Sequence, residues 1–327
     1  MMRARSTCVL GGLLTAIGLA ALMLTTTHTS GQAPAPPGVP RTVDGQPDFS
    51  GIWQANNTAN WDLQTHVARP MVGQPGVYPD IPVPAAPVLA LGSIGWAPGG
   101  LGVVVGDEIP YQPWAAERKR ENAEHWLDRD PEIFCYLPGV PRAMYLPYPF
   151  QIFQGTNKIM MIFEFANAQR IVHLDEVEPY PNDAWMGHSV AHWEGDTLVI
   201  ESTSFTPYTW FDRAGNFHSD ALHVVERFSY LTPDAIQYEA TIEDEQVFTR
   251  PWTIRMPLYR RLEQHAQLLD FRCVEMVEET LYGHLRKEPL VTTWEGDTMR
   301  VDITRRFEIG DERVYERHLS GNPPDPR

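Results

Sequence analysis

Alternation of apolar and polar residues is the dominant pattern in the second half of the chain. Between residues 236 and 242 every second residue is apolar and the residues between them are polar, which is the period of a β-strand with one buried face. Three shorter strands are expected at 150–154, 158–165 and 169–173, separated by Gly-Thr-Asn and Ala-Asn-Ala. Short strands with turn residues between them predict an antiparallel meander.

A five-residue sequence, Trp-Glu-Gly-Asp-Thr, occurs at 193–197 and again at 294–298, and an alternating strand follows each copy. Glycine beside aspartate between two strands is typical of a tight hairpin, since glycine accepts positive φ. The repeat indicates either a duplicated unit or two hairpins with the same favourable turn. In both cases the chain is predicted to be mainly β, an antiparallel meander that forms a barrel or a barrel-like sandwich.

The first half of the chain lacks this alternation. Residues 56–106 are rich in proline, glycine and alanine, which predicts irregular chain over the core. One short helix is expected after Pro113, a residue suited to the first turn, and it should end before Pro131. We therefore expect an irregular segment with the first strand and this helix at 41–148, an antiparallel β core at 149–320 and a tail at 321–327.

The N-terminus has the pattern of a secretory signal. A basic start precedes an apolar run at 9–24 and a small, polar stretch at 25–32, and the apolar run is short for a membrane span. Residues 1–33 are predicted to be a signal peptide, with an uncleaved membrane tether as the alternative, and 34–40 a proline-rich linker. The protein is therefore expected to be periplasmic or secreted.

Charge and cysteine content narrow the partners. The formal net charge is −16, which argues against nucleic acid and anionic membranes as partners because both need a basic surface. Beyond the signal only Cys135 and Cys273 remain. An oxidising compartment makes them a candidate disulfide, with two free buried thiols as the alternative.

Four segments resemble an uncharacterised family of secreted bacterial proteins. They are Asp-Gly-Gln-Pro-Asp-Phe-Ser-Gly-Ile-Trp at 44–53, the turn at 135–142, Ser-Val-Ala-His-Trp-Glu-Gly-Asp-Thr-Leu-Val at 189–199 and the strand at 219–228. This resemblance covers most of the chain and implies no catalytic residues. The Gly-Ile-Trp sequence at 51–53 is also similar to the start of the first strand in the lipocalin and calycin group, which implies a closed barrel with a ligand cup at one end.

Strand phase places two charged residues on apolar faces. Glu226 lies in phase with the apolar residues of 222–230, and Arg305 lies in phase with those of 298–307. A buried carboxylate without a partner would be costly, so an ion pair between Glu226 and Arg305 is one interpretation. The other is that Glu226 is a tuned acid or base, or that Arg305 binds a substrate carboxylate.

Histidines gather between 188 and 223. His188 and His192 are four apart on a predicted strand and should share a face, while His218 and His223 flank the entrance of the next strand. The compact zinc-binding signatures are missing, so neither a metal site nor a cofactor is predicted. Ser219 lies between His218 and Asp220, but neighbouring residues do not normally form a catalytic triad, and a Gly-x-Ser-x-Gly elbow is missing too.

The loop at 205–219 combines aromatic and titratable residues at a sheet end, a composition typical of clefts for small, flat or apolar molecules. The alternative is a loop held by its own aromatic cluster. The candidate ligand-binding residues are Trp185, Tyr208, Trp210, Arg250, Trp252 and Arg305.

Three hypotheses for function follow. The first is an exported protein that binds a small apolar or aromatic ligand in a barrel cup beneath the 205–219 loop. The second is a metal-independent lyase, isomerase or hydrolase that uses acid-base chemistry, with His188, His218, Asp212 and Glu226 as its candidate catalytic residues. The third is an envelope scaffold that binds partners through residues 56–106. A small molecule is the only partner predicted, and the oligomeric state is not predicted.

Overall fold

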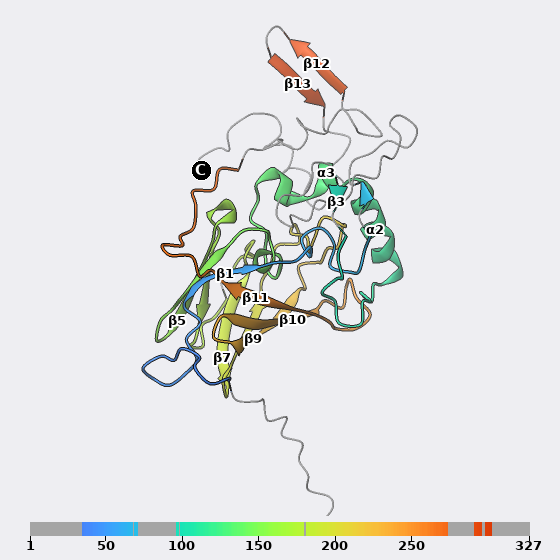
Figure 1. Ribbon diagram of the computed structural model, residues 1–327. Coiled ribbons are helices and arrows are strands. Elements are labelled where there is room, and N and C mark those ends of the chain that lie inside the picture. Colours follow the sequence, from blue (N-terminus) through green and yellow to red (C-terminus); the bar gives the residue numbers. More distant parts are fainter. Residues whose placement is uncertain are drawn as a thin grey trace, which may run out of the picture. The chain divides into compact units, whose positions relative to one another are not determined.

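Nine strands form a closed barrel in the order β1-β11-β10-β9-β8-β7-β6-β5-β4 (Figure 1). The computed structural model describes residues 35–67, 69–70, 96–97, 99–179, 181–273, 291–295 and 298–302. The barrel strands are β1 (Gly51–Ala55), β4 (Phe150–Gln154), β5 (Lys158–Phe163), β6 (Gln169–His173), β7 (His188–Glu194), β8 (Thr197–Thr203), β9 (His223–Thr232), β10 (Ala235–Glu243) and β11 (Trp252–Arg260). The predicted β-barrel is confirmed.

Antiparallel pairs make up most of the barrel, as the meander pattern predicts. On β10 the apolar positions from Ile236 to Ile242 are fully buried, which confirms the predicted inward face. One neighbouring pair is parallel, because β6 and β7 are joined by the long connection 174–187, which lets β7 run in the direction of β6. This makes the barrel mixed.

Closure of the barrel depends on β1. This strand pairs with β4 on one side, where Trp53 lies opposite Phe150, and with β11 on the other, where Trp53 lies opposite Arg260. The first strand of the otherwise irregular segment is thus part of the barrel wall. Arg260 also lies over the Trp53 ring, 4.2 Å from its centroid.

Two further hairpins lie outside the barrel order. β2 (Arg69–Pro70) pairs with β3 (Trp96–Ala97), and β12 (Val291–Glu295) pairs with β13 (Thr298–Asp302). The second copy of the repeated Trp-Glu-Gly-Asp-Thr sequence spans β12 and β13, just as the first spans β7 and β8.

The helical segments of the described chain are short, and all but one lie between β1 and β4. α2 (Pro113–Glu124) begins at the predicted proline and is followed by the single turn α3 (Trp126–Arg129). Three 3-10 turns follow, η1 (Pro131–Phe134), η2 (Arg142–Met144) and η3 (Phe165–Asn167). Among the described residues no helix is long and apolar enough to cross a membrane.

We call the barrel end at which β8 joins β9 and β10 joins β11 the capped end. The chain before α2 contacts the β10–β11 connection there, since the Gln112 amide donates to the Val247 carbonyl at 2.8 Å. Gly215, in the β8–β9 connection, fits against the α2 backbone, where a Cβ would lie 2.6 Å from the Ala123 nitrogen. Helix and loops together cover this end.

At the opposite end an aromatic side chain from the N-terminal segment enters the barrel. Phe49 is fully buried and stacks on Tyr230 at 4.9 Å and on Trp193 at 6.1 Å between ring centroids. Arg41 binds Asp196 in the β7–β8 turn through two hydrogen bonds of 2.9 Å and so holds this segment in place.

A disulfide joins Cys135 to Cys273, with their Cα atoms 5.7 Å apart, so the predicted pairing is confirmed. Residues 261–273, which we call the strap, lead from the end of β11 to this bond. The strap contacts the barrel where the Leu269 amide donates to Glu164 at 2.8 Å and where Phe271 packs on Phe165.

Candidate functional site

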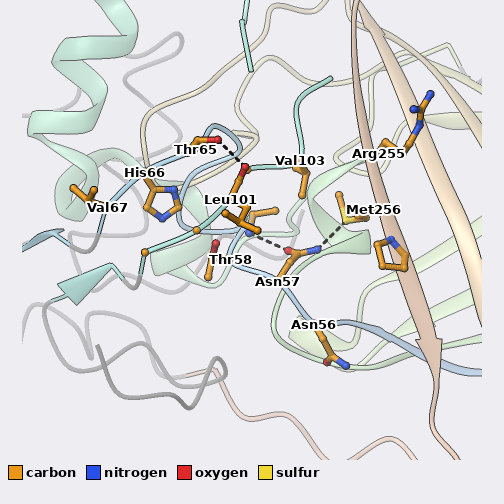
Figure 2. Close-up of a pocket in the computed structure, with 15 residues that line it drawn as sticks. Asn56, Asn57, Thr58, Thr65, His66, Val67, Leu101, Val103, Arg255 and Met256 are labelled. Carbon is orange, nitrogen blue, oxygen red and sulfur yellow. Dashed lines mark hydrogen bonds between the residues drawn. The ribbon is translucent and has the colours of Figure 1, made fainter. Parts of the chain in front are cut away.

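A pocket of about 730 Å³ opens in the barrel wall where β1 and β11 separate (Figure 2). We call it the β1–β11 pocket. Its walls come from residues 56–59 after β1, from two segments at 65–67 and 99–103, and from Arg255, Met256 and Pro257 on β11. Pockets for small molecules in proteins have this size, roughly 300–1,000 Å³.

The separation of the two strands follows from Pro257. On the β1 side of β11, the backbone amides of Arg255 and Arg261 donate to the carbonyls of Val103 and Ile52. Amides two positions apart on a strand point to the same side, so position 257 should present its amide to this side as well. Proline has no N–H and cannot continue this ladder. The pairing of β1 with β11 accordingly ends with Ala55 opposite Leu258. Beyond Pro257, the residue that accepts a backbone hydrogen bond from β11 is Val103.

Glycines let the outer walls of the pocket pack closely. Gly100 pairs with His66 through two backbone hydrogen bonds of 2.9 and 3.0 Å, and a Cβ at Gly100 would lie 2.0 Å from the Thr58 hydroxyl. Gly102 has a φ of +73°, and a Cβ there would lie 2.6 Å from the Thr65 nitrogen. Larger residues are therefore excluded at both positions, and the two segments form one wall.

The pocket is mainly apolar with a few polar groups. Figure 2 shows His66 and Thr58 beside the pocket, while the Arg255 guanidinium is turned away from it and bonds to Glu239 at 2.8 Å. His66 Nδ1 donates to the Gln64 carbonyl at 2.9 Å, which fixes the orientation of the ring. The apolar lining residues are Ala59, Val67, Leu101, Val103, Met256 and Pro257.

The 205–219 loop fills the capped end. Trp210, Asp212 and His218 are at most 3% exposed. Phe211 packs edge-on against Trp252 at 5.6 Å between ring centroids. The aromatic side chains of this loop thus pack on one another and on the barrel, as in the alternative interpretation of the loop.

Asp212 organises the loop through four N–H donors. Its carboxylate accepts from the amides of Leu63, Ala214 and Asn216 at 2.8, 2.9 and 3.2 Å and from the Asn216 side chain at 2.5 Å. Burial raises the pKa of Asp212 to about 7, with the charge of Asp62 adding to the rise and the hydrogen bonds opposing it.

His218 is held between two oxygen atoms in the same loop. Nδ1 lies 2.7 Å from the Ser219 carbonyl and Nε2 lies 2.6 Å from the Thr209 hydroxyl, so the neutral ring donates to the first and accepts from the second. Burial lowers the pKa of His218. The Ser219 hydroxyl donates to Asp244 instead of His218.

Glu226 lies inside the barrel and pairs with Arg170 through two hydrogen bonds. Tyr238 donates to the same carboxylate at 2.9 Å, and Ser189 and Ser202 accept from the guanidinium at 2.9 and 2.8 Å. The predicted partner of Glu226, Arg305, lies outside the described residues, and within them the partner is Arg170. On β6, Arg170 and Val172 face the interior. This alternation is visible in the sequence and could have identified Arg170 as an inward cation, but the sequence analysis did not use it.

His188 lies on the outer side of the barrel wall. Ser189 next to it points inward to Arg170, so His188 points outward, and its Nε2 lies 3.0 Å from the Val177 carbonyl. Its ring stacks on His173 at 5.5 Å between centroids. The four predicted catalytic residues therefore lie in three places, which are the barrel interior, the capped end and the outer wall.

Two of the predicted ligand-binding residues are brought together. Trp185 stacks on Tyr136, next to the disulfide, at 4.8 Å and contacts Tyr208 at 6.0 Å between ring centroids. Arg250 lies apart on the surface and pairs with Glu108 at 3.2 Å.

A second buried charge cluster was not predicted from the sequence. Arg142 forms two hydrogen bonds of 2.7 Å with Asp130, and Arg213 bonds to Glu132 at 2.9 Å. The Arg213 guanidinium lies over the Trp61 ring at 4.7 Å and over the Trp126 ring at 5.2 Å. Arg213 lies far along the chain from the segment 130–142, which carries the other three charged residues, and the four follow no regular period. The pattern of the chain therefore carries no sign of the cluster.

In the described part of the chain, no group of three His, Cys, Asp or Glu side chains is placed to hold a metal ion. No protein-family model matches the chain, and no curated protein is similar to it in sequence.

Proposed function

We propose that the protein binds a small apolar or aromatic molecule in the β1–β11 pocket. The observation that carries the proposal is the pocket itself, a space of about 730 Å³ with a largely apolar wall and a few polar groups. The Met256 thioether lies in the wall, where its sulfur accepts from the Asn57 side chain at 3.2 Å. The Thr58 hydroxyl offers a hydrogen bond to one polar substituent of the ligand.

The proposed place of action is outside the cytoplasm. The basic, apolar and small-residue order of the first 33 residues supports it. The Cys135–Cys273 disulfide supports it as well, since disulfides persist in oxidising compartments.

The acid-base enzyme has less support than binding. Its candidate residues lie in three separate places, and both oxygens of Glu226 are occupied by Arg170 and Tyr238. A general base needs to lie within hydrogen-bond reach of the substrate proton.

One observation favours the scaffold hypothesis. Val67 and Leu101, in the segment predicted to bind partners, are 81% and 92% exposed. Exposed apolar side chains at the rim of a pocket can contact a protein partner as well as a small ligand. A partner that covers the rim would compete with the ligand described next.

The test is binding of N-phenyl-1-naphthylamine, a neutral aromatic dye, to the full chain, followed by dye fluorescence and by thermal shift. We expect saturable binding that raises the melting temperature. Leu101→Lys should weaken it about tenfold, since a charge at the rim opposes an apolar ligand. Leu101 is 92% exposed, so the variant should fold.

The matched control is Met160→Lys, which also replaces an exposed apolar side chain by lysine but lies outside the pocket. It should leave dye binding unchanged. Equal loss in both variants, or dye binding that never saturates, would refute the pocket as the binding site.

A further inference from the structure

An uninterrupted row of exposed apolar side chains crosses three neighbouring strands of the barrel wall. Phe153 on β4 lies opposite Met160 on β5, and Met160 lies opposite Ile171 on β6. Their exposures are 44%, 40% and 47%. Because directly opposite residues of one sheet face are close neighbours, the three side chains form one stripe, which we call the β4–β6 row.

The charge around this row differs from that of the remaining wall. The other outward side chains of β4–β6 are Gln151, Lys158, Ile162, Gln169 and His173, with no carboxylate among them. The outward face of β7–β10 carries four carboxylates, Glu194, Glu201, Glu239 and Glu243, against one guanidinium, Arg227, which pairs with Glu194. Two molecules with a net charge of −16 repel each other least where acids are missing.

We propose that the β4–β6 row is a self-association surface that binds the same row of a second copy of this chain. In a two-fold symmetric contact the same patch is used by both molecules. Met160 lies on the middle strand of the three, so it meets its own counterpart near the symmetry axis. Phe153 and Ile171 complete the apolar centre on either side.

The size of the row sets the strength of the pairing. Neighbouring strands are about 4.8 Å apart, so the row spans only about 10 Å, while a stable complex buries about 800 Å² on each partner. A weak, concentration-dependent dimer is therefore expected, and the β1–β11 pocket, built from other residues, stays accessible in it.

The experiment is sedimentation velocity of the full chain over a range of concentrations, at about 0.05 M and about 0.5 M salt. We expect a monomer–dimer equilibrium that strengthens at high salt, because salt screens the repulsion between two acidic molecules. Met160→Lys should raise the dissociation constant about tenfold or more, since it brings two cations together at the axis.

Three further samples make the result decisive. Met160→Leu should keep the dimer, and Leu101→Lys should leave it unchanged. A monomer under all conditions, or a dimer that Met160→Lys and Leu101→Lys weaken equally, would overturn the proposal. The third sample is the protein with phosphatidylcholine vesicles. If the protein is monomeric and binds the vesicles, and Met160→Lys abolishes that binding, the β4–β6 row is a lipid-binding surface and the proposal is overturned.

Discussion

Arg170 and Glu226 form the most consequential pair of single residues in the barrel. Both are almost completely buried, and both are satisfied by Tyr238, Ser189 and Ser202. Removing one partner of such a pair leaves an uncompensated charge in an apolar interior. The pair is therefore best described as a structural element of the interior, which also explains why an acid can stand in the apolar phase of β9.

Arg170→Ala is expected to lower the free energy of unfolding by about 3–5 kcal/mol, because Glu226 would lose its counterion. Urea denaturation measures this. Arg255→Ala is the control, since its ion pair with Glu239 is exposed and should contribute only about 0–1 kcal/mol. If the two variants lost similar stability, the buried pair would have no special role.

His218 contributes a loss of stability in acid at the capped end, opposite in sign to the contribution of Asp212, whose pKa is raised. Burial lowers the pKa of His218 in the folded protein, so below about pH 6.5 the unfolded chain takes up a proton that the folded chain does not. More protons bind to the unfolded state, and stability falls as pH decreases through this value. One such group changes the free energy of unfolding by at most about 1.4 kcal/mol per pH unit.

His218→Gln should reduce this slope between about pH 5 and pH 7, because glutamine does not titrate. Urea unfolding at several pH values gives the slope directly. His192→Gln, at a 53% exposed side chain, is the matched control and should leave the slope as it is. A slope unchanged by His218→Gln would assign the acid sensitivity to other groups.

At the level of elements, the sequence predicts where the strands lie better than it predicts which strands pair with one another. The bounds of β4 and β6 agree with the alternation because each strand carries its own period. The parallel β6–β7 pair and the contact of Arg170 with Glu226 depend on register between distant segments, which local alternation does not encode. Likewise, the pocket depends on Pro257 facing β1, and that requires the barrel order.

The strap is an element whose attachment can be measured. The Cys135–Cys273 bond joins positions 138 residues apart, and a bond across a loop of this length restricts the unfolded chain strongly. Replacing both cysteines by serine should lower the free energy of unfolding by about 3–5 kcal/mol. Thermal unfolding of the variant and of the reduced wild type should agree, and a reductant without effect on the wild type would contradict the prediction.

At the level of the whole molecule, the two proposed surfaces use different parts of one closed wall. The β1–β11 pocket lies where the wall opens at Pro257, and the β4–β6 row lies on strands that β1 separates from β11. On the outward face of β7–β10 four carboxylates stand beside one guanidinium, whereas the outward face of β4–β6 carries no carboxylate. Composition gives only the net charge of the chain, and this difference between two parts of the wall depends on the fold.

The closing contact of the barrel also sets the order in which the protein folds. Trp53 and Arg260 meet across β1 and β11 although they are 207 positions apart. The hairpins from β7 to β11 form between neighbours in sequence, whereas chain entropy delays a pairing over so long a distance. During synthesis the ring stays open until Arg260 has left the ribosome, which leaves the proposed export time to act before folding is complete.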